Sequence, residues 1–403
     1  VVTVDSSSAL GTFANANVGT GKTVTITGLA LSGNDASNYA VTDASNATAN
    51  ITAKTLTVTG LSASASRVYN GTQTASVTGT PTLLTAQAAG AGNSADGKPY
   101  TGDVIGFTGT ANGTYNDKSV AAATTVTFGG LTSNNSNYTF DLGTQAATIT
   151  QADLTLTGVT VQNKTYNATL TAVLAGTPAV NALGVDVVNI NAGGASGLFA
   201  DKNVGTGKTV TVSGYTLGGA DGGNYHLIQP TGLTADITKA DLQVTGVTAQ
   251  NKVYDATLSA TLTGVATVAA LAADVVNVGG TGVGVFADKN VGTAKPVTAS
   301  GFTISGADAS NYNLLQPVGL TADITRATLS LSGITAANKT YDNSNVATVS
   351  VAAVVKAGLV VNDVVNVSTT GVFSDENAAN GKTVTLTSSY SGADAGNYSI
   401  THQ

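Results

Sequence analysis

Residues 286–312 read FADKNVGTAKPVTASGFTISGADASNY, and residues 199–225 carry a close copy, FADKNVGTGKTVTVSGYTLGGADGGNY. Apolar side chains alternate with threonine in these stretches, as at Val210 and Val212. Successive side chains of a strand point to opposite faces, so this period of two is typical of a half-buried antiparallel strand. Glycine, asparagine and aspartate gather between the alternating runs, where turns need a positive φ. The stretch therefore predicts strands joined by tight turns.

The stretch belongs to a repeat that runs the length of the chain. Near the start of each unit stands a sequence such as NKVYDATL, whose tyrosines are spaced by 97, 88 and 87 residues: Tyr69, Tyr166, Tyr254 and Tyr341. An Asn-Tyr pair follows each glycine-rich turn, with the tyrosines Tyr39, Tyr138, Tyr225, Tyr312 and Tyr398. A closing sequence such as ADIT ends the units, with the isoleucines Ile51, Ile149, Ile237 and Ile324. The last unit lacks this closing sequence.

These markers divide the chain into one half-unit and four units. The boundaries are 1–53 for the half-repeat, 54–151 for repeat A, 152–239 for repeat B, 240–326 for repeat C and 327–403 for repeat D. The half-repeat is the C-terminal half of a unit, and repeat D lacks its closing strand. Repeat A carries an insertion near 86–101 that is predicted to be a polar surface loop. A length of 403 residues alone would suggest two or three domains, but the repeat overrides that expectation.

The predicted fold class is all-β, with tandem small β-sandwich-like modules of about 87 residues joined end to end in a semi-rigid rod. No segment shows helical periodicity with start and stop signals. A parallel β-solenoid is the rival fold, but it would need a sub-period of roughly 20–30 residues, which the sequence does not show.

The unit boundaries share one spacing. Ile324 precedes Leu329 by five positions, and the same step separates the equivalent residues at the other boundaries. Side chains an odd number of positions apart in a continuous strand point to opposite faces, so we expect the strand to bury its opposite face or to bend at each boundary. No Gly/Ser or Pro linker intervenes, and a connector of fixed length favours a semi-rigid arrangement over a flexible one.

Composition excludes several classes of function. The chain has 16 Lys+Arg against 23 Asp+Glu and a net charge of −7, with basic residues scattered singly, so nucleic-acid binding is not expected. No apolar run is long enough to span a membrane. The absence of cysteine excludes disulfides, thiol nucleophiles and cysteine-based zinc sites. The first residues, VVTVDSSSAL, show no signal peptide, so we expect the sequence to begin inside a longer protein whose export signal is encoded upstream.

The sequence predicts no enzyme, and no catalytic, cofactor-binding or metal-binding residue is assigned. His226 and His402 are the only histidines, and Asn313 and Ser399 replace His226 in other repeats, which indicates exposed strand surface. The GTGK sequence that ends at Lys208 lacks the following helix of a phosphate-binding loop.

Aspartates in two sets of loops could offer oxygen ligands to calcium: Asp201, Asp288 and Asp375 in one set, and Asp221, Asp308 and Asp394 in the other. Each loop supplies little more than one carboxylate, whereas calcium takes six to eight oxygens. Asx-turns explain these aspartates without a metal, so no cofactor is predicted and structural calcium remains the alternative.

The recurrent tyrosine is followed by Asn or Asp and could stack on a sugar. We expect instead that the ring packs in the core of each unit with its hydroxyl bonded at the edge, and that the following Asn or Asp shapes a turn. The lysines two positions before these tyrosines, Lys164, Lys252 and Lys339, are predicted to be solvated.

The unit at 240–326, with LQVTGVT, NKVYDAT, DVVNV, GVFADKNVGTAKPV, SGADASNY and LTADIT in order, resembles the YDG-type repeat found with the related MBG repeats in stalks of large bacterial surface proteins. Many of these are similar to filamentous-haemagglutinin-like adhesins exported by two-partner secretion. The sequence departs from the Tyr-Asp-Gly pattern, because glycine occupies the third position only at Gly71. The resemblance implies an extracellular or cell-surface location and a structural or adhesive role.

Three functions follow from this resemblance and from the residues. The first is an extracellular stalk or spacer of a bacterial adhesin that contributes to adhesion or biofilm. The alternative is a self-assembling extracellular filament or matrix fibre built through inter-chain strand or edge contacts. A carbohydrate-binding module is the third. The expected partners are other copies of the chain or neighbouring repeats, together with host or matrix glycans or proteins that would bind outside this sequence.

Overall fold

The computed structural model describes residues 1–42 and 45–402, and these contain strands and short 3-10 turns but no α-helix. Strands make up 53% of the structure and form many small sheets, which confirms the prediction of tandem β-rich modules. No helix among these residues could cross a membrane. The chain forms two compact units: the first comprises Val1–Thr160, Gly176–Ser196 and Val212–Thr231, and the second comprises Val161–Ala175, Gly197–Thr211 and Gly232–Gln403.

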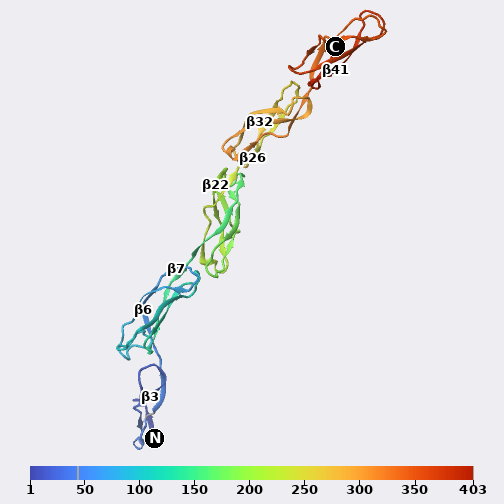
Figure 1. The fold of residues 1–403 in the computed structure, drawn as a ribbon. Helices are drawn as coiled ribbons and strands as arrows, with labels where there is room; N and C mark the ends of the chain where they lie inside the picture. The colour runs from blue at the N-terminus through green and yellow to red at the C-terminus, as the bar shows by residue number, and fades with distance from the viewer. Residues whose placement is uncertain (43–44, 403) are drawn as a thin grey trace. The chain divides into compact units, whose positions relative to one another are not determined.

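Repeat C lies wholly in the second compact unit and shows the architecture most completely (Figure 1). Its elements are β26 (Ala240–Gln243), β27 (Thr245–Ala249), β28 (Lys252–Val253), β29 (Ser259–Ala260), β30 (Leu262–Thr267), β31 (Asn277–Phe286), β32 (Gly292–Ser305), η3 (Ala309–Asn311), β33 (Tyr312–Leu315) and β34 (Leu320–Thr325). One sheet has the order β28-β34-β32-β31-β29, and β26-β33 and β27-β30 form two-stranded sheets.

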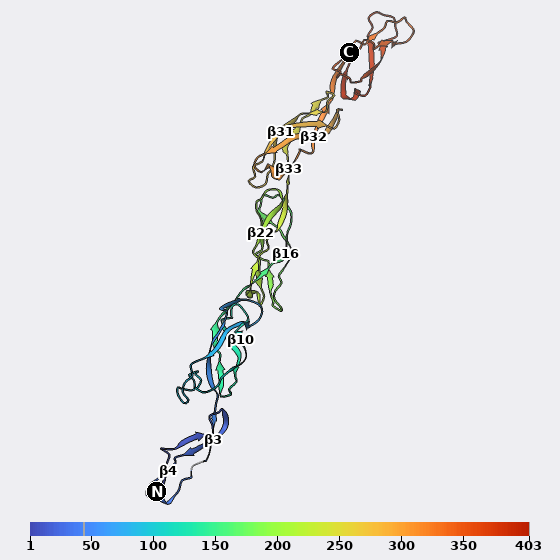
Figure 2. The same ribbon diagram turned by 60° about the vertical axis from the view of Figure 1, so that its left-hand side comes forward.

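The long hairpin of β31 and β32 organises repeat C. These strands lie side by side in the orange part of Figure 2 and pair antiparallel from Asn277↔Ser305 to Phe286↔Val297, with one register shift between Gly280 and Val283. The closing strand β34 pairs antiparallel with β32 and parallel with β28. The strand containing the repeat's first tyrosine motif and the closing strand are therefore neighbours in one sheet.

The core of the second compact unit continues from repeat C into repeat D. Tyr254, Phe286 and Ile324 of repeat C belong to the same buried cluster as Leu329 and Tyr398 of repeat D. Burial of a large apolar side chain stabilises a fold by about 1.5–3 kcal/mol, so this shared cluster links the stability of the two repeats. Between β34 and the first strand of repeat D, regular strand structure is interrupted at a single residue, Arg326.

Repeat D has a similar order of elements with a smaller sheet, lacks a counterpart of β28 and β34 among the described residues, and adds one short strand, β39 (Val355–Ala357). Its elements are β35 (Ala327–Ser332), β36 (Thr335–Ala336), β37 (Val346–Ala347), β38 (Val349–Ser350), β39 (Val355–Ala357), β40 (Asn366–Phe373), β41 (Val384–Ser391), η4 (Ala395–Asn397) and β42 (Tyr398–Thr401). Its sheet β37-β40-β41 ends at β41 within the described residues, whereas repeat C adds β34 and β28 at the corresponding edge.

The first compact unit contains the half-repeat and repeat A. The half-repeat forms the sheet β2-β3-β5 from β2 (Leu10–Phe13), β3 (Gly19–Thr27) and β5 (Ser45–Ile51). Repeat A pairs β6 (Lys54–Ala63) in parallel with β12 (Tyr138–Asp141), and β7 (Ser66–Val68) in parallel with β14 (Thr148–Thr150). These parallel pairs match β26-β33 and β28-β34 of repeat C.

The insertion near 86–101 is exposed at residues 88–95, as predicted for a polar surface loop, but folds back onto repeat A at residues 96–100. Gly97 bridges to Leu56 at the start of repeat A, and Gly97 and Pro99 are buried. Asp96 forms an ion pair of 2.7 Å with the buried ammonium of Lys54. A buried ammonium needs a compensating charge, which explains why this polar segment folds back onto β6.

Candidate functional site at the repeat boundaries

The A/B, B/C and C/D boundaries are each built on a short 3-10 turn that ends at the Asn of the Asn-Tyr pair: η2 (Gly222–Asn224) in repeat B, η3 in repeat C and η4 in repeat D. In η3 the turn buries Asn311, whose side-chain oxygen accepts a hydrogen bond of 2.9 Å from the backbone N–H of Val204 in repeat B. The Asn311 amide also donates to the side chain of Asn203 at 3.1 Å. The turn therefore ties a loop of one repeat to the next repeat.

Five side chains from two repeats meet beside this turn. Repeat B supplies Tyr166 and Lys202, and repeat C supplies Asp274, Asp308 and Tyr312. The two tyrosine hydroxyls donate to one oxygen of Asp274, at 2.6 Å from Tyr166 and 2.7 Å from Tyr312. The Lys202 ammonium forms an ion pair with Asp274 and another, at 3.0 Å, with Asp308. We call this group the B/C hub.

Ring packing accompanies the polar contacts of the B/C hub. The rings of Tyr166 and Tyr312 meet edge to face, with centroids 5.4 Å apart and planes at 79°. The backbone N–H of Leu271 donates to the Tyr312 hydroxyl at 2.9 Å, so this hydroxyl both accepts and donates. Edge-to-face pairs add about 0.5–1.5 kcal/mol beyond the area that they bury.

The same constellation occurs at the A/B boundary, in the first compact unit. Tyr69 and Tyr225 donate to one oxygen of Asp186, at 2.7 Å and 2.8 Å. Lys118 lies 3.3 Å from Asp186 and 3.6 Å from Asp221. The two rings again meet edge to face, at 5.4 Å. This is the A/B hub.

The C/D hub repeats the arrangement with one exchange. Tyr398 donates to Asp363 at 2.6 Å, while Tyr254 lies 3.5 Å from an oxygen of Asp394. Lys289 pairs with Asp394 at 3.0 Å and with Asp363 at 3.4 Å. Three consecutive boundaries thus place one lysine between two aspartates and two tyrosines.

Burial and charge set the protonation states of the B/C hub. The side chain of Asp274 is 1% exposed and that of Lys202 is 36% exposed. Burial by itself would raise the pKa of Asp274, but hydrogen bonds from Lys202, Tyr166 and Tyr312 outweigh it and lower the pKa. The pKa of Lys202 is raised by its bonds to Asp274 and Asp308. Burial, with the bond to Asp274, raises the pKa of Tyr312 to about 12. The hub therefore holds an ionised aspartate and lysine between neutral tyrosines.

At the boundary between the half-repeat and repeat A, the hydrogen bond between the asparagine side chain and a backbone N–H is present, and the described residues form no ion pairs like those of the hubs. Asn137 accepts from the backbone N–H of Val18 at 2.8 Å, as Asn311 does from Val204. Ala16 stands where Lys202 stands in repeat B, and Asn134 stands where Asp308 stands in repeat C. The hub is therefore a feature of particular boundaries.

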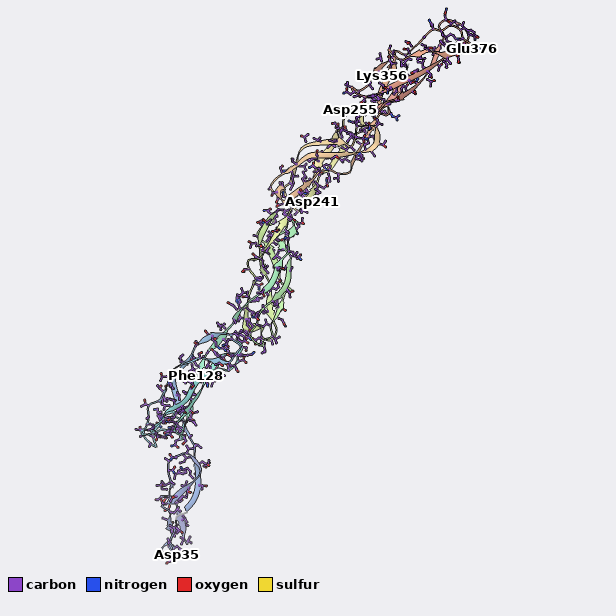
Figure 3. All side chains as sticks on the ribbon, viewed as in Figure 1. Asp35, Phe128, Asp241, Asp255, Lys356 and Glu376 are labelled. Atoms are coloured by element: carbon purple, nitrogen blue, oxygen red, sulfur yellow. The ribbon has the colours of Figure 1, made fainter. Side chains whose placement is uncertain are left out.

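The far end of repeat D carries altered hub residues. Glu376 occupies the position of Lys202 and Lys289. Figure 3 shows Glu376 and Lys356 at opposite ends of repeat D. Tyr341, the counterpart of Tyr254, is 57% exposed, and its hydroxyl donates to its own neighbour Asn343 at 3.0 Å.

The prediction for the recurrent tyrosines is confirmed in three repeats and wrong in the fourth. Tyr69, Tyr166 and Tyr254 are buried with their hydroxyls bonded, and the residue after each, such as Asn167, shapes a turn by accepting from Thr169 N–H at 3.2 Å. Tyr341 lies on the surface because no strand equivalent to β34 covers it among the described residues.

The prediction of solvated lysines before these tyrosines is wrong. Lys252 donates to Asp255 at 2.7 Å and to the carbonyl of Thr257 at 2.8 Å, and it lies over the ring of Phe286 at 5.4 Å. Its side chain is largely buried, so the lysine fastens the turn after the tyrosine onto the core. Lys164 and Lys339 make the equivalent contacts.

The two histidines considered from the sequence, His226 and His402, lie apart from the hubs. The exposed ring of His226 bonds Asp153 on the adjacent strand at 3.0 Å, at a position where Asn313 bonds Asp241 in repeat C. His402 bonds the exposed hydroxyl of Tyr390 at 3.2 Å.

The aspartates of the first loop set form Asx-turns. Asp201, Asp288 and Asp375 each accept from the backbone N–H two residues on at 2.8 Å and pair with a lysine seven residues on. The described residues contain no cluster of three or more His, Cys, Asp or Glu side chains placed to hold a metal ion. The GTGK sequence ending at Lys208 lies at the start of strand β22 (Gly205–Ser213).

Sequence reasoning missed the central aspartates of the hubs. Asp186, Asp274 and Asp363 each begin the sequence Asp-Val-Val-Asn, which recurs at the repeat period. The recurrence was a usable signal for a shared role. The full set of partners could not be read from one repeat, because one tyrosine and the lysine that bind each aspartate belong to the preceding repeat.

A protein-family model for the YDG domain matches residues 1–48, 150–233, 238–319 and 325–403, which together make up more than half of the chain. The chain belongs to the YDG domain family. The matched regions cover most of the half-repeat and of repeats B, C and D, and the YDG model does not match most of repeat A, where the insertion occurs. No curated protein and no solved structure matches this YDG protein.

Proposed function

We propose that this YDG protein is an extracellular structural stalk or spacer of a bacterial adhesin, which contributes to cell-surface adhesion or biofilm. The observation that carries the proposal is the recurrence of the hub at three consecutive repeat boundaries. A hub joins side chains of adjacent repeats and leaves no free nucleophile or acid of its own, so its chemistry is that of a joint.

The hub resists bending for physical reasons. A flexible connection between repeats would have to expose Asp274 or leave it unpaired when the neighbouring repeat moves, and breaking a buried ion pair on one side is costly. A stalk needs joints that transmit orientation, because its task is to hold a distant binding surface away from the cell. The acidic composition suits a solvated surface in this setting.

Two measurements on cells that produce the protein test the stalk proposal. Antibodies against repeat C should label intact cells, and an external protease should remove the label. Deletion of residues 240–326, which removes one whole repeat, should shorten the reach of the adhesive surface and preserve adhesion at close contact. Exclusively intracellular label, or loss of adhesion at every distance with normal export, would contradict the proposal.

The alternative is a self-assembling extracellular filament or matrix fibre. The observation that favours it is the outer strand β29 of the large sheet in repeat C, one edge of which pairs with no described strand. Unpaired strand edges are templates for strands of another chain. Electron microscopy of material isolated without heat or denaturant separates the two functions: ordered fibres with inter-chain strands support the filament, and single-chain particles support the stalk.

A further inference from the structure

Two segments of repeat C, one at its start and one at its end, run side by side in the same direction. The opening segment (240–253) comprises β26, β27 and β28, and the closing segment (312–325) comprises β33 and β34. β33 pairs parallel with β26, where Ala240 faces Tyr312, and β34 pairs parallel with β28. In both pairs the facing residues are 72 positions apart. The closing segment therefore follows the opening segment in one register.

The chain enters and leaves repeat C at opposite ends of these two segments. Tyr312, at the start of the closing segment, belongs to the B/C hub, and Tyr254, just after the opening segment, belongs to the C/D hub. Figure 3 likewise shows Asp241 and Asp255 at opposite ends of the repeat. The chain enters beside Tyr312 and leaves after Thr325, which pairs with the end of β28. A pull on the two ends of the repeat therefore acts along the paired strands.

This parallel pairing determines how tension acts on the hydrogen bonds of repeat C. Tension draws the opening segment and the closing segment in opposite directions, so the two segments must slide past each other before either one leaves the repeat. Interstrand hydrogen bonds run across the strands, and sliding strains all the bonds of a pair together. Separation of two strands from one end breaks the same bonds one after another. Sliding therefore meets a higher barrier than separation from one end.

The closing strand β34 is held on both of its edges. It pairs antiparallel with β32 on one edge and parallel with β28 on the other. The N–H of Asp323 donates to the side chain of Asn251 at 2.7 Å, and the N–H of Ala294 donates to the side chain of Asp323 at 2.7 Å. The N–H of Tyr254 donates to the carbonyl of Thr325 at 2.9 Å. Withdrawal of β34 along its own direction has to break the contacts on both edges.

The same pairing recurs in other repeats. In repeat A the opening strand β6 pairs parallel with β12, and β7 pairs parallel with β14. In repeat D β35 pairs parallel with β42. The parallel arrangement of the first and last strands is therefore a property of the repeat and not of repeat C alone.

We propose that a repeat with both parallel pairs is a mechanical clamp, which resists tension along the chain because its opening and closing segments are sheared against each other. This function goes beyond that of a spacer, since a spacer sets a distance at rest and a clamp keeps that distance under force. The inference rests on the strand pairing of repeat C and not on the location of the protein. Failure of the clamp in a pulling experiment would therefore leave the stalk proposal to its own test.

Pulling on repeat C in two directions within the full chain tests the clamp. The chain has no cysteine, so pairs of introduced cysteines attach DNA handles for optical tweezers at chosen exposed positions. Asp241→Cys with Thr325→Cys loads opposite ends of the two segments and shears them, whereas Asp241→Cys with Asn313→Cys loads facing residues and pulls the strands apart sideways. At one loading rate we expect a first rupture force at least about twofold higher for shearing, because forced unfolding follows the unfolding barrier.

Two substitutions separate mechanical from thermodynamic loss. Asn251→Ala removes the acceptor of the Asp323 N–H, so it should lower the shearing force and leave the sideways force unchanged. Gly280→Ala places a Cβ 2.3 Å from the carbonyl oxygen of Gly301 in the hairpin of β31 and β32, outside the two segments. It should lower thermal stability with a smaller loss of shearing force than Asn251→Ala. The clamp is overturned if both pulling directions give equal forces, or if Asn251→Ala leaves the shearing force unchanged in a chain whose circular dichroism shows that it is folded.

Discussion

The hydroxyl of Tyr166 in repeat B is one of the groups that connect this repeat to repeat C. The hydroxyl donates to buried Asp274, whereas Tyr341, at the same position of repeat D, donates only to its own neighbour Asn343. Hydrogen bonds to charged groups contribute more to stability than neutral ones. The two tyrosines therefore form a natural pair for a comparison in which only the repeat context differs.

We predict that Tyr166→Phe lowers the free energy of opening at the B/C boundary by about 1–2 kcal/mol, because Asp274 loses one of its donors while it stays buried. Tyr341→Phe is the control and should change this free energy by less than about 0.5 kcal/mol. Amide exchange of peptides that contain residues 202–204 and 311–312 measures both. Equal effects of the two substitutions would contradict a joining role for the hydroxyl.

At the scale of single residues, some features could be predicted from the sequence and others could not. The alternation of Val210 and Val212 with threonine predicted strands, and burial of Tyr166 followed from its recurrence. The role of Asp274 did not follow, because aspartate in a turn-rich sequence usually bonds its own backbone. Two of its partners, Tyr166 and Lys202, come from another repeat, and no local spacing in the sequence relates them to Asp274.

At the scale of elements, paired glycines shape the strands. Gly246 and Gly264 face each other across β27 and β30, with φ of +78° and +92°. A Cβ on Gly264 would lie 2.2 Å from the carbonyl oxygen of Gly246, and a Cβ on Gly246 would meet the Val265 oxygen. The close backbone approach at this register shift therefore requires glycine on both strands.

We predict that Gly264→Ala destabilises repeat C by clearly more than Gly319→Ala. Both positions have positive φ, which costs a non-glycine residue about 1–2 kcal/mol, but only Gly264 adds a backbone clash. At Gly319 a Cβ would meet nothing within 4 Å. Denaturant unfolding followed by circular dichroism compares the two variants, and an equal loss in both would show that φ strain alone governs the site.

At the scale of the molecule, the hubs give stability a defined pH window. Asp186 and Asp274 have lowered pKa values, so the unfolded chain binds more protons in acid and stability falls as the pH drops below about 4. Tyr312 and Tyr398 have pKa values raised from 10 to about 12, so the folded state binds more protons in alkali. Stability therefore also falls as the pH rises from about 10 to about 12.

The predicted profile is a plateau of thermal stability between about pH 5 and 9 with a loss on each side. Circular dichroism melting in low salt measures it. A variant with Tyr312→Phe and Tyr398→Phe should have a shallower alkaline limb, since two of the titrating hydroxyls are gone. An unchanged alkaline limb in this variant would show that these hydroxyls do not govern it.

The central claim is that the hubs hold neighbouring repeats in a fixed orientation, and a distance measurement across the C/D hub tests it most directly. The chain has no cysteine, so Val265→Cys and Val355→Cys, at exposed positions in repeats C and D, accept spin labels without background. Double electron–electron resonance should give one narrow distance distribution, which broadens when Asp363→Ala removes the acceptor of Tyr398. A broad distribution in the otherwise unchanged chain, or a narrow one that survives Asp363→Ala, would contradict the claim.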